Sequence, residues 1–359
     1  MFSKEIARHA DACRFCWMCR HICPVAGSTG NESWTPRAKG LLISMIERGT
    51  EYDAGIADVM YHCTFCDACA NDCVTGYRPS EFIRAARTQA LVDGLAPASV
   101  TKAIETVMEQ GNIFGEAQKV TCPGAAASAD TLLYLGQTVR AVQPEQGTAA
   151  AGLLAKAGVA YMVMDDEPAS GAYLGELMGY TGDVQTVAAA AAEALTKTGA
   201  SKLVVLNPAD AQMFKEQYAQ WGLLSGMEIV TYTSFVAELL KDGKLAPKAV
   251  KRQASLQEPV KLTRGIEEEA PAKALIEAAG IENIEMFLNG KMSRCVGTVP
   301  FEKIAPETTK EMVRVRTDDA RRMGSTAMVT VSPDDYYVLN KYAVDMEILD
   351  LFTLLNEQC

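Results

Sequence analysis

Two copies of one cysteine spacing dominate the first 73 residues of this 359-residue chain. In each copy, three cysteines are separated by two residues and a fourth follows after three more; the runs are Cys13, Cys16, Cys19, Cys23 and Cys63, Cys66, Cys69, Cys73. Thiolates at this spacing can converge on one iron–sulfur cube, and the fourth cysteine of such a run usually ligates the other cluster. The spacing therefore predicts two [4Fe–4S] clusters with crossed ligands. Cluster 1 would take Cys13, Cys16, Cys19 and Cys73, and cluster 2 would take Cys63, Cys66, Cys69 and Cys23.

Two other uses of such cysteines are less well matched. Zinc sites usually combine two cysteine pairs and leave no third and fourth cysteine in each run. Disulfides need an oxidising compartment, and the start, Met1–Glu5, lacks the apolar core of a secretory signal. We therefore expect iron–sulfur clusters.

Composition places the chain among soluble globular proteins. It is 48% hydrophobic and 22% charged, and its length suits two or three domains. The net charge of −11 argues against nucleic acid or an anionic membrane surface as the main partner. Since no apolar run reaches about 18 residues, we expect a cytoplasmic protein that meets a membrane only through a partner.

The first 110 residues are predicted to be mostly helical. The 39 residues between Cys23 and Cys63 suit an α-helical ferredoxin, in which helices join the cluster loops. Thr35 before Pro36 predicts an N-cap and a helix start. A second helix is predicted from Pro79 or Ser80 to about Val92, with an inner stripe of Phe82, Ile83, Ala86 and Ala90.

Several other side chains lie near the cysteine runs. The three histidines of the chain are His9, His21 and His62. Because each predicted cluster already has four cysteines, we expect these histidines to take supporting or surface roles. Trp17 and Phe65 lie inside the cysteine loops and are expected to shield the clusters from water.

Beyond Gly111 the pattern changes to short apolar runs alternating with helical stretches. The predicted strands are 160–164, 202–206, 227–230, 284–288 and 327–331, and the clearest predicted helices are 184–197 and 307–322. This alternation favours α/β units with a mainly parallel sheet. Residues 346–355 are predicted to form an over-apolar helix that covers the second sheet or offers Leu351, Leu354 and Leu355 to a partner.

An internal repeat runs through this region. Residues 199–210 match residues 324–335 at a constant offset of 125. The predicted fold is therefore an α-helical ferredoxin domain (1–110) followed by an α/β region of two pseudo-symmetric half-domains (111–250 and 251–359).

With the cysteine runs and this repeat, the chain resembles two-cluster iron–sulfur subunits with a C-terminal CCG-type region. These include subunits of anaerobic glycerol-3-phosphate dehydrogenase, glycolate oxidase, lactate utilisation systems and heterodisulfide reductase. The segment 36–40, Pro-Arg-Ala-Lys-Gly, also resembles the link between motifs in that group. The resemblance implies an electron-transfer subunit.

The CCG motifs themselves have lost most of their cysteines. The family's Cys-Cys-Gly and Cys-Pro-x-Cys segments correspond here to 168–171 and 207–210 in the first repeat, and to 293–297 and 332–335 in the second. The cysteines outside the runs, Cys122, Cys295 and Cys359, are too few for a third cluster. Asp334 and Asp335 are expected to start a helix rather than to bind a hard metal ion.

Three functions follow from these observations. The favoured one is an electron relay between a flavoprotein and a further acceptor. The alternatives are a catalytic subunit of the heterodisulfide reductase type and a cluster-based redox sensor. No phosphate loop or flavin fingerprint is evident, so a flavin must come from another chain. By resemblance, that partner is a flavin-containing dehydrogenase or an electron-transferring flavoprotein in a hetero-oligomer.

Overall fold

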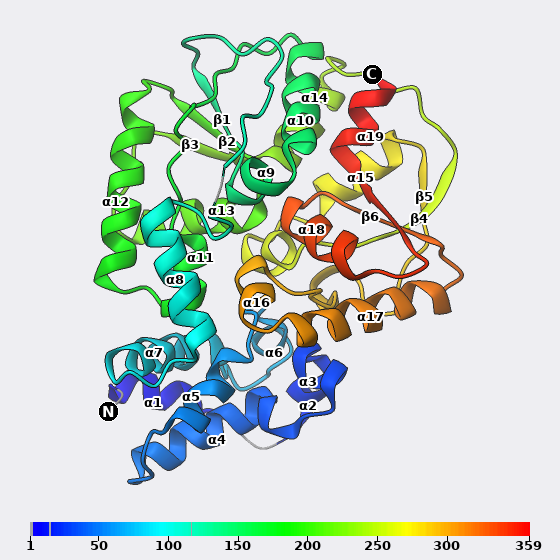
Figure 1. Cartoon of the computed structure of the whole chain (residues 1–359). Helices are drawn as coiled ribbons and strands as arrows, with labels where there is room; N and C mark the ends of the chain where they lie inside the picture. The colour runs from blue at the N-terminus through cyan, green and yellow to red at the C-terminus, as the bar shows by residue number, and fades with distance from the viewer. Residues whose placement is uncertain (1–2, 14–15, 116) are drawn as a thin grey trace.

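The computed structural model describes residues 3–13, 16–115 and 117–359; Met1 and Phe2, part of the start discussed above, lie outside this range. Figure 1 shows a helical N-terminal domain at one end of the molecule, with two sheet-containing halves side by side above it. The architecture is a ferredoxin-like domain followed by a helix-rich α/β body. No helix of the described part is long and apolar enough to cross a membrane.

The N-terminal domain is built from short helices. They are α1 (Lys4–Asp11), α2 (Met18–Ile22), α3 (Pro24–Thr29), η1 (Glu32–Trp34), α4 (Pro36–Glu47), α5 (Ala54–Tyr61), α6 (Ala68–Asn71), α7 (Pro79–Val92) and α8 (Ala98–Gln110). Thr35 caps α4 through a hydrogen bond from the Ala38 amide at 3.2 Å, as predicted. The predicted stripe of α7 is also confirmed, because all four of its residues are buried.

The first half of the body holds a parallel three-stranded sheet in the order β1-β2-β3. Its elements are β1 (Thr131–Tyr134), α9 (Gln137–Val142), α10 (Pro144–Lys156), α11 (Ala172–Met178), α12 (Gly182–Lys197), β2 (Lys202–Val205), α13 (Pro208–Gln212), η2 (Met213–Tyr218), β3 (Glu228–Thr231) and α14 (Tyr232–Lys241). The strands are in register, with Thr131 opposite Lys202 and Lys202 opposite Glu228. The predicted strand at 160–164 is reduced to one bridge, Met162 to Leu132.

The second half holds a parallel four-stranded sheet in the order β5-β4-β6-β7. Its elements are β4 (Arg252–Leu256), η3 (Lys261–Gly265), α15 (Ala270–Ala278), β5 (Ile281–Asn283), η4 (Gly290–Met292), α16 (Val299–Ile304), α17 (Pro306–Arg322), β6 (Ala327–Thr330), α18 (Pro333–Tyr342), β7 (Glu347–Asp350) and α19 (Leu351–Gln358). The predicted strand at 284–288 is wrong: the strand ends at Asn283, and Phe287 is exposed.

The two sheets share a strand order. Met162 bridges to Leu132 of β1 and can be counted as an additional strand beside it. Numbered along the chain within each half, the strands of both sheets then have the same spatial order, 2-1-3-4. The repeated segments also carry the same elements, since β2 and β6 begin at Lys202 and Ala327, and α13 and α18 begin at Pro208 and Pro333. The offset of 125 seen in the sequence therefore lies on equivalent helix–strand–helix units.

The predicted helix at 346–355 is instead a strand and a helix. β7 completes the second sheet, and α19 packs against α10 of the first half. Leu351 and Leu355 are fully buried in a hydrophobic cluster that also contains Leu133 and Val204. The two halves thus share one core that buries Leu351 and Leu355, whereas Leu354 is only partly buried.

Candidate cluster site

The described parts of the two cysteine runs share a local backbone feature. The residue after the second cysteine of each run has a left-handed conformation, with φ of 68° at Trp17 and 53° at Asp67. A short helix begins at the next residue and carries the third cysteine, Cys19 in α2 and Cys69 in α6. Left-handed backbone costs about 1 kcal/mol or more in a residue with a side chain, and such strain concentrates at functional sites. Both loops therefore have the strained turn expected of a ligand-binding loop.

One group of thiols combines the first run with the end of the second. The pKa of Cys19 is raised to about 11, mainly by burial and further by the neighbouring thiols of Cys13, Cys16 and Cys73. Thr75 ties the two segments together, because its hydroxyl donates to the Ala12 carbonyl at 2.9 Å and lies 3.2 Å from the Cys73 sulfur. Cys16 is exposed, so this group lies close to solvent.

The second group combines the second run with the end of the first. Burial raises the pKa of Cys23 to about 12, and the thiols of Cys66 and Cys63 add to the rise. Burial also raises the pKa of Cys69, with contributions from Cys66, Cys63 and Cys23. These four cysteines line a single cavity, together with Lys39, His62 and Ile83. Four thiols around one cavity, buried under apolar and cationic neighbours, fit an iron–sulfur cluster.

Two buried cations lie beside this second group. Lys39, only 2% exposed, donates to the Trp34 carbonyl; burial lowers the pKa of its ammonium group, and the nearby Cys63, Cys23 and Cys69 sulfurs oppose that shift. Arg87 donates to the Cys63 carbonyl at 2.7 Å and to the Met60 carbonyl at 3.0 Å. Their positive charges offset the negative charge of thiolates that lack water around them. The site is therefore suited to hold anionic sulfur ligands.

The histidine nearest the cysteines has a supporting place. The His62 ring stacks on Trp34 at 3.6 Å, and burial lowers its pKa to about 4. His62 therefore stays neutral at physiological pH and packs beside the loop that begins at Cys63. His21 is exposed and lines the groove between the N-terminal domain and α17 that is described below.

The α/β body makes direct contacts with the Cys63–Cys69 loop. Arg264 of η3 donates through Nε to the Cys66 carbonyl at 2.6 Å. Lys261 donates to the Phe65 carbonyl at 3.4 Å and pairs with Glu176 at 2.9 Å. Cys295 is buried next to this loop, in a hydrophobic cluster that also touches Cys66. The α/β body is thus part of the environment of the cysteine loop.

The positions where the resembling family carries cysteines form a buried polar network. The Ser170 hydroxyl and the Asn207 amide both donate to Asp210, the amide at 3.0 Å. Across the boundary between halves, the hydroxyl groups of Tyr173 and Thr138 donate to Asp334 at 2.6 and 2.7 Å. These segments are therefore held together by hydrogen bonds between buried side chains.

This network lies at the carboxyl ends of parallel strands, where α/β sheets usually place their functional groups. Asp210 follows β2, and Asp334 and Asp335 follow β6 in the first turn of α18, so the predicted helix start is confirmed. Burial raises the pKa of Asp210 to about 7, and burial together with Asp334 raises that of Asp335 to about 8. Sequence reasoning missed that these acids are buried together, although their place directly after apolar strands was a usable signal.

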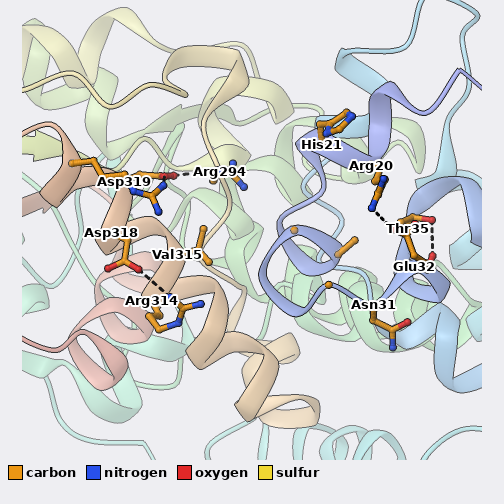
Figure 2. Close-up of a pocket in the computed structure, with 14 residues that line it drawn as sticks. Arg20, His21, Asn31, Glu32, Thr35, Arg294, Arg314, Val315, Asp318 and Asp319 are labelled. Carbon is orange, nitrogen blue, oxygen red and sulfur yellow. Dashed lines mark hydrogen bonds and ion pairs between the residues drawn. The ribbon is translucent and has the colours of Figure 1, made fainter.

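A second polar feature lies between the N-terminal domain and α17. This groove has a volume of about 500 Å³. Figure 2 shows arginines on both of its walls. Each of these arginines has a carboxylate partner: Arg20 pairs with Glu32, Arg314 with Asp318 at 3.0 Å, and Arg294 and Arg322 with Asp319 at 3.2 and 3.6 Å. The charges of the groove are therefore largely balanced within it.

Comparison with known proteins agrees with this site. Residues 9–77 match the family model described as a 4Fe-4S dicluster domain. The chain is 25% identical over 324 residues to one of the subunits of the dihydromethanophenazine:CoB–CoM heterodisulfide reductase of Methanosarcina mazei, covering 80% of this chain and 77% of that protein. It is 21% identical to the probable iron-sulfur-binding oxidoreductase FadF of Bacillus subtilis, covering 90% of this chain and 55% of that protein.

Two further similarities concern a partial relative and the fold. The chain is 23% identical to a probable membrane-anchored ferredoxin of Chromohalobacter salexigens, over 67% of this chain and 38% of that protein. A crystal structure of a hypothetical protein from Helicobacter pylori shares the fold, with a TM-score of 0.57, 13% identity, and coverage of 99% of this chain and 73% of that one. These findings confirm the resemblance to iron–sulfur subunits of oxidoreductases.

Proposed function

We propose that this relative of iron–sulfur oxidoreductase subunits, with its 4Fe-4S dicluster domain, relays single electrons through two [4Fe–4S] clusters. The observation that carries the proposal is the grouping of the thiols. Cys19 has Cys13, Cys16 and Cys73 as electrostatic neighbours, whereas Cys69 has Cys66, Cys63 and Cys23. Each group takes one cysteine from the other run, which supports crossed ligation.

The side chains of the protein set the conditions for this transfer. A bound cluster supplies one-electron redox chemistry. Lys39 and Arg87 hold positive charge beside the cluster 2 thiols and stabilise added negative charge. Phe65 is buried and excludes water from the same loop. At the other group, the exposed Cys16 gives the electron a short route to a partner at the surface.

The proposed partner is a flavin-containing dehydrogenase or an electron-transferring flavoprotein, in a hetero-oligomer. The name of the Methanosarcina mazei relative, one subunit of a heterodisulfide reductase, supports assembly with other subunits. We also propose that residues 111–250 and 251–359 form pseudo-symmetric half-domains, supported by the shared strand order. In this proposal the complex is cytoplasmic and meets a membrane only through a partner.

The test is whether the last cysteine of one run affects the cluster held by the other run, as crossed ligation requires. Protein purified without oxygen is expected to hold about eight iron and about eight sulfide per chain, the content of two cubes. Cys73→Ser should alter the electron paramagnetic resonance signal of the cluster held by Cys13, Cys16 and Cys19. Cys359→Ser, at an exposed position, is the matched control. A loss confined to the cluster of Cys63, Cys66 and Cys69 would refute crossed ligation.

The catalytic alternative has its own test. The structure places Cys122 half-buried in the first half, Cys295 beside Cys66, and Cys359 at the exposed end of α19. Thiol–disulfide chemistry needs an activated thiolate and usually a second cysteine. Replacing all three by serine should leave electron transfer in the complex intact. If turnover stops while both clusters stay loaded, a catalytic role is established instead.

A further inference from the structure

Cys295 is a buried thiol that the proposed relay does not use. It lies in the loop between η4 and α16, and only 3% of it is exposed. Cys66, in the loop between α5 and α6, packs against the hydrophobic cluster that contains Cys295, Phe301 and Met312. Burial raises the pKa of the Cys295 thiol, and the nearby Cys66 sulfur adds to the rise. A fifth thiol therefore lies beside the four of the second cysteine group.

Two side chains connect the loops that carry these cysteines. Arg264 donates through Nε to the Cys66 carbonyl at 2.6 Å and through Nη1 to the Ser293 carbonyl at 2.7 Å. Because a guanidinium presents its donors in a fixed fork, it sets the separation of the two backbones. The buried Thr64 side chain also makes a hydrogen bond to Cys295. The body thus holds Cys295 against the loop that contains Cys66.

The loop around Cys295 has little freedom to move. The Gly297 amide donates to the Cys295 sulfur at 3.4 Å. Gly297 has a φ of 116°, and an added Cβ would lie 2.9 Å from Cγ2 of Thr309, so the turn requires glycine. Arg316 donates to the Ser293 hydroxyl at 3.0 Å. The position of the Cys295 thiol is therefore set by its own loop and by the helix α17.

The two thiols differ in their access to oxidants. Cys66 is half-buried, whereas a fully buried, protonated thiol such as Cys295 is inert toward oxidants in solution. A cysteine that has been oxidised to a sulfenic acid condenses with an adjacent thiol. In the proposed ligation, Cys63, Cys69 and Cys23 are bound to iron. Cys295 is therefore the neighbouring thiol that neither proposed cluster occupies.

We propose that Cys295 is the resolving cysteine for Cys66, so that a peroxide that oxidises Cys66 leaves a reversible disulfide between the two residues. This inference rests on the proposed ligation of cluster 2 and adds a modification site to it. Once Cys66 is released from iron, its thiolate attacks one oxygen of hydrogen peroxide, the O–O bond breaks, and hydroxide leaves. Cys66 is then a sulfenic acid.

The second step forms the disulfide. The Cys295 sulfur attacks the Cys66 sulfur, the S–O bond breaks, and the hydroxyl group leaves as water with the Cys295 proton. Cys66 is thereby protected from the irreversible oxidation to a sulfinic acid, and a thiol reductant restores both thiols. The loop can then receive a cluster again.

The first test identifies the bond directly. Full-length protein, loaded with clusters without oxygen, is treated with hydrogen peroxide until the electron paramagnetic resonance signal of cluster 2 is lost. Free thiols are blocked with N-ethylmaleimide, and the protein is digested with trypsin without reduction. Residues 295–303 form a tryptic peptide with a single cysteine, so fragmentation identifies its partner. We expect this peptide to be linked to Cys66. A maleimide-labelled Cys295, or a link to Cys63 or Cys69 instead, would overturn the proposal.

The second test measures repair. The treated protein is reduced with dithiothreitol and reloaded with ferrous iron and sulfide. Wild type should regain the cluster 2 signal, whereas Cys295→Ser should regain at least about threefold less, with Cys66 found as a sulfinic acid. Cys122→Ser, at a half-buried position in the first half, is the matched control and should recover like the wild type. Equal recovery of all three proteins would refute the protective role.

A further variant and one measurement keep these outcomes distinct. Cys295→Ala adds no polar group to the buried site and should behave like the serine variant, which covers the case in which the serine variant folds poorly. Iron is measured before the peroxide treatment. A content well below about eight iron per chain would refute the two-cluster relay. A fully loaded protein that forms no disulfide with Cys295 would refute the resolving role and leave the relay intact.

Discussion

At the scale of single residues, two buried titratable side chains matter most. Lys39 lies among the thiols of the second cysteine group, and Asp210 lies in the buried polar network with Ser170 and Asn207. Each is expensive to bury and is stabilised by specific partners. Each therefore gives a prediction that depends on one side chain.

Replacing Lys39 with methionine should lower the reduction potential of cluster 2. A reduced cluster carries one more negative charge, which the lysine stabilises. Loss of a neighbouring unit charge in the protein interior is worth on the order of 1.4 kcal/mol or more, so the potential should fall by at least about 59 mV for one electron. A redox titration followed by electron paramagnetic resonance measures the shift. Lys102→Met, at an exposed position of α8, is the control, and equal potentials would contradict the role of Lys39.

The raised pKa of Asp210 predicts a pH-dependent stability. Its pKa is about 7 in the folded chain and about 3.8 in the unfolded chain. The folded state therefore holds the proton more tightly, and the stability that this proton provides is lost as pH rises from about 4 through 7. Asp210→Asn keeps a neutral side chain, so it should reduce the loss of melting temperature between pH 4.5 and pH 7.5.

The matched control for this measurement is Asp183→Asn. Asp183 is exposed in the first turn of α12, and its replacement should leave the pH profile unchanged. If the Asp210 variant follows the same profile as the wild type, then Asp210 is ionised in the folded protein and its hydrogen bonds compensate for the charge.

At the scale of elements, local signals predicted some structures and tertiary contacts decided others. The helix at Pro36 could be predicted because its cap and its first residue lie next to each other. Residues 347–350 could not be recognised as a strand, because an apolar run of this length fits either a helix or a buried strand until its neighbours are known. The partners of Asp334 lie 161 and 196 residues away, so no local pattern could reveal its burial. The cysteine loops were the easiest part, since their spacing is itself the signal.

The packing of α19 on α10 gives a prediction for the leucine stripe. Leu351→Ala or Leu355→Ala should lower the free energy of unfolding by about 2–5 kcal/mol, because each leaves a cavity in the core shared by the halves. Leu354 is only partly buried, and Leu354→Ala should cost clearly less. Urea denaturation of the three variants makes the comparison. A similar small loss for all three would indicate that α19 separates readily from α10.

At the scale of the whole molecule, the two cysteine groups differ in their cover. Cys16 is exposed and Trp17 and Met18 beside it are 45% and 54% exposed, whereas the Cys63–Cys69 loop lies under Arg264 and Lys261. The first group therefore faces solvent, and the second faces the α/β body. The two proposed clusters should therefore differ in how fast oxygen destroys them.

Exposure to air should therefore destroy cluster 1 before cluster 2. Oxygen reaches a solvent-facing cluster more readily than one covered by protein. Iron release and the two electron paramagnetic resonance signals, followed over time in air-saturated buffer, measure the order of loss. Anaerobic incubation for the same time is the control. Simultaneous loss of both signals would show that the cover over the second group gives no protection.

The hydrogen bond from Arg264 to the Cys66 carbonyl joins residues 198 positions apart. A ribosome adds about 5–20 residues per second, so the roughly 190 residues between Cys73 and Arg264 take about 10–40 s to synthesise. Throughout that interval both cysteine runs exist without the body that later covers the second loop. Under the proposed ligation, the second cysteine group is most open to cluster insertion during translation, whereas in the finished chain the α/β body covers its loop and only the first group still faces solvent.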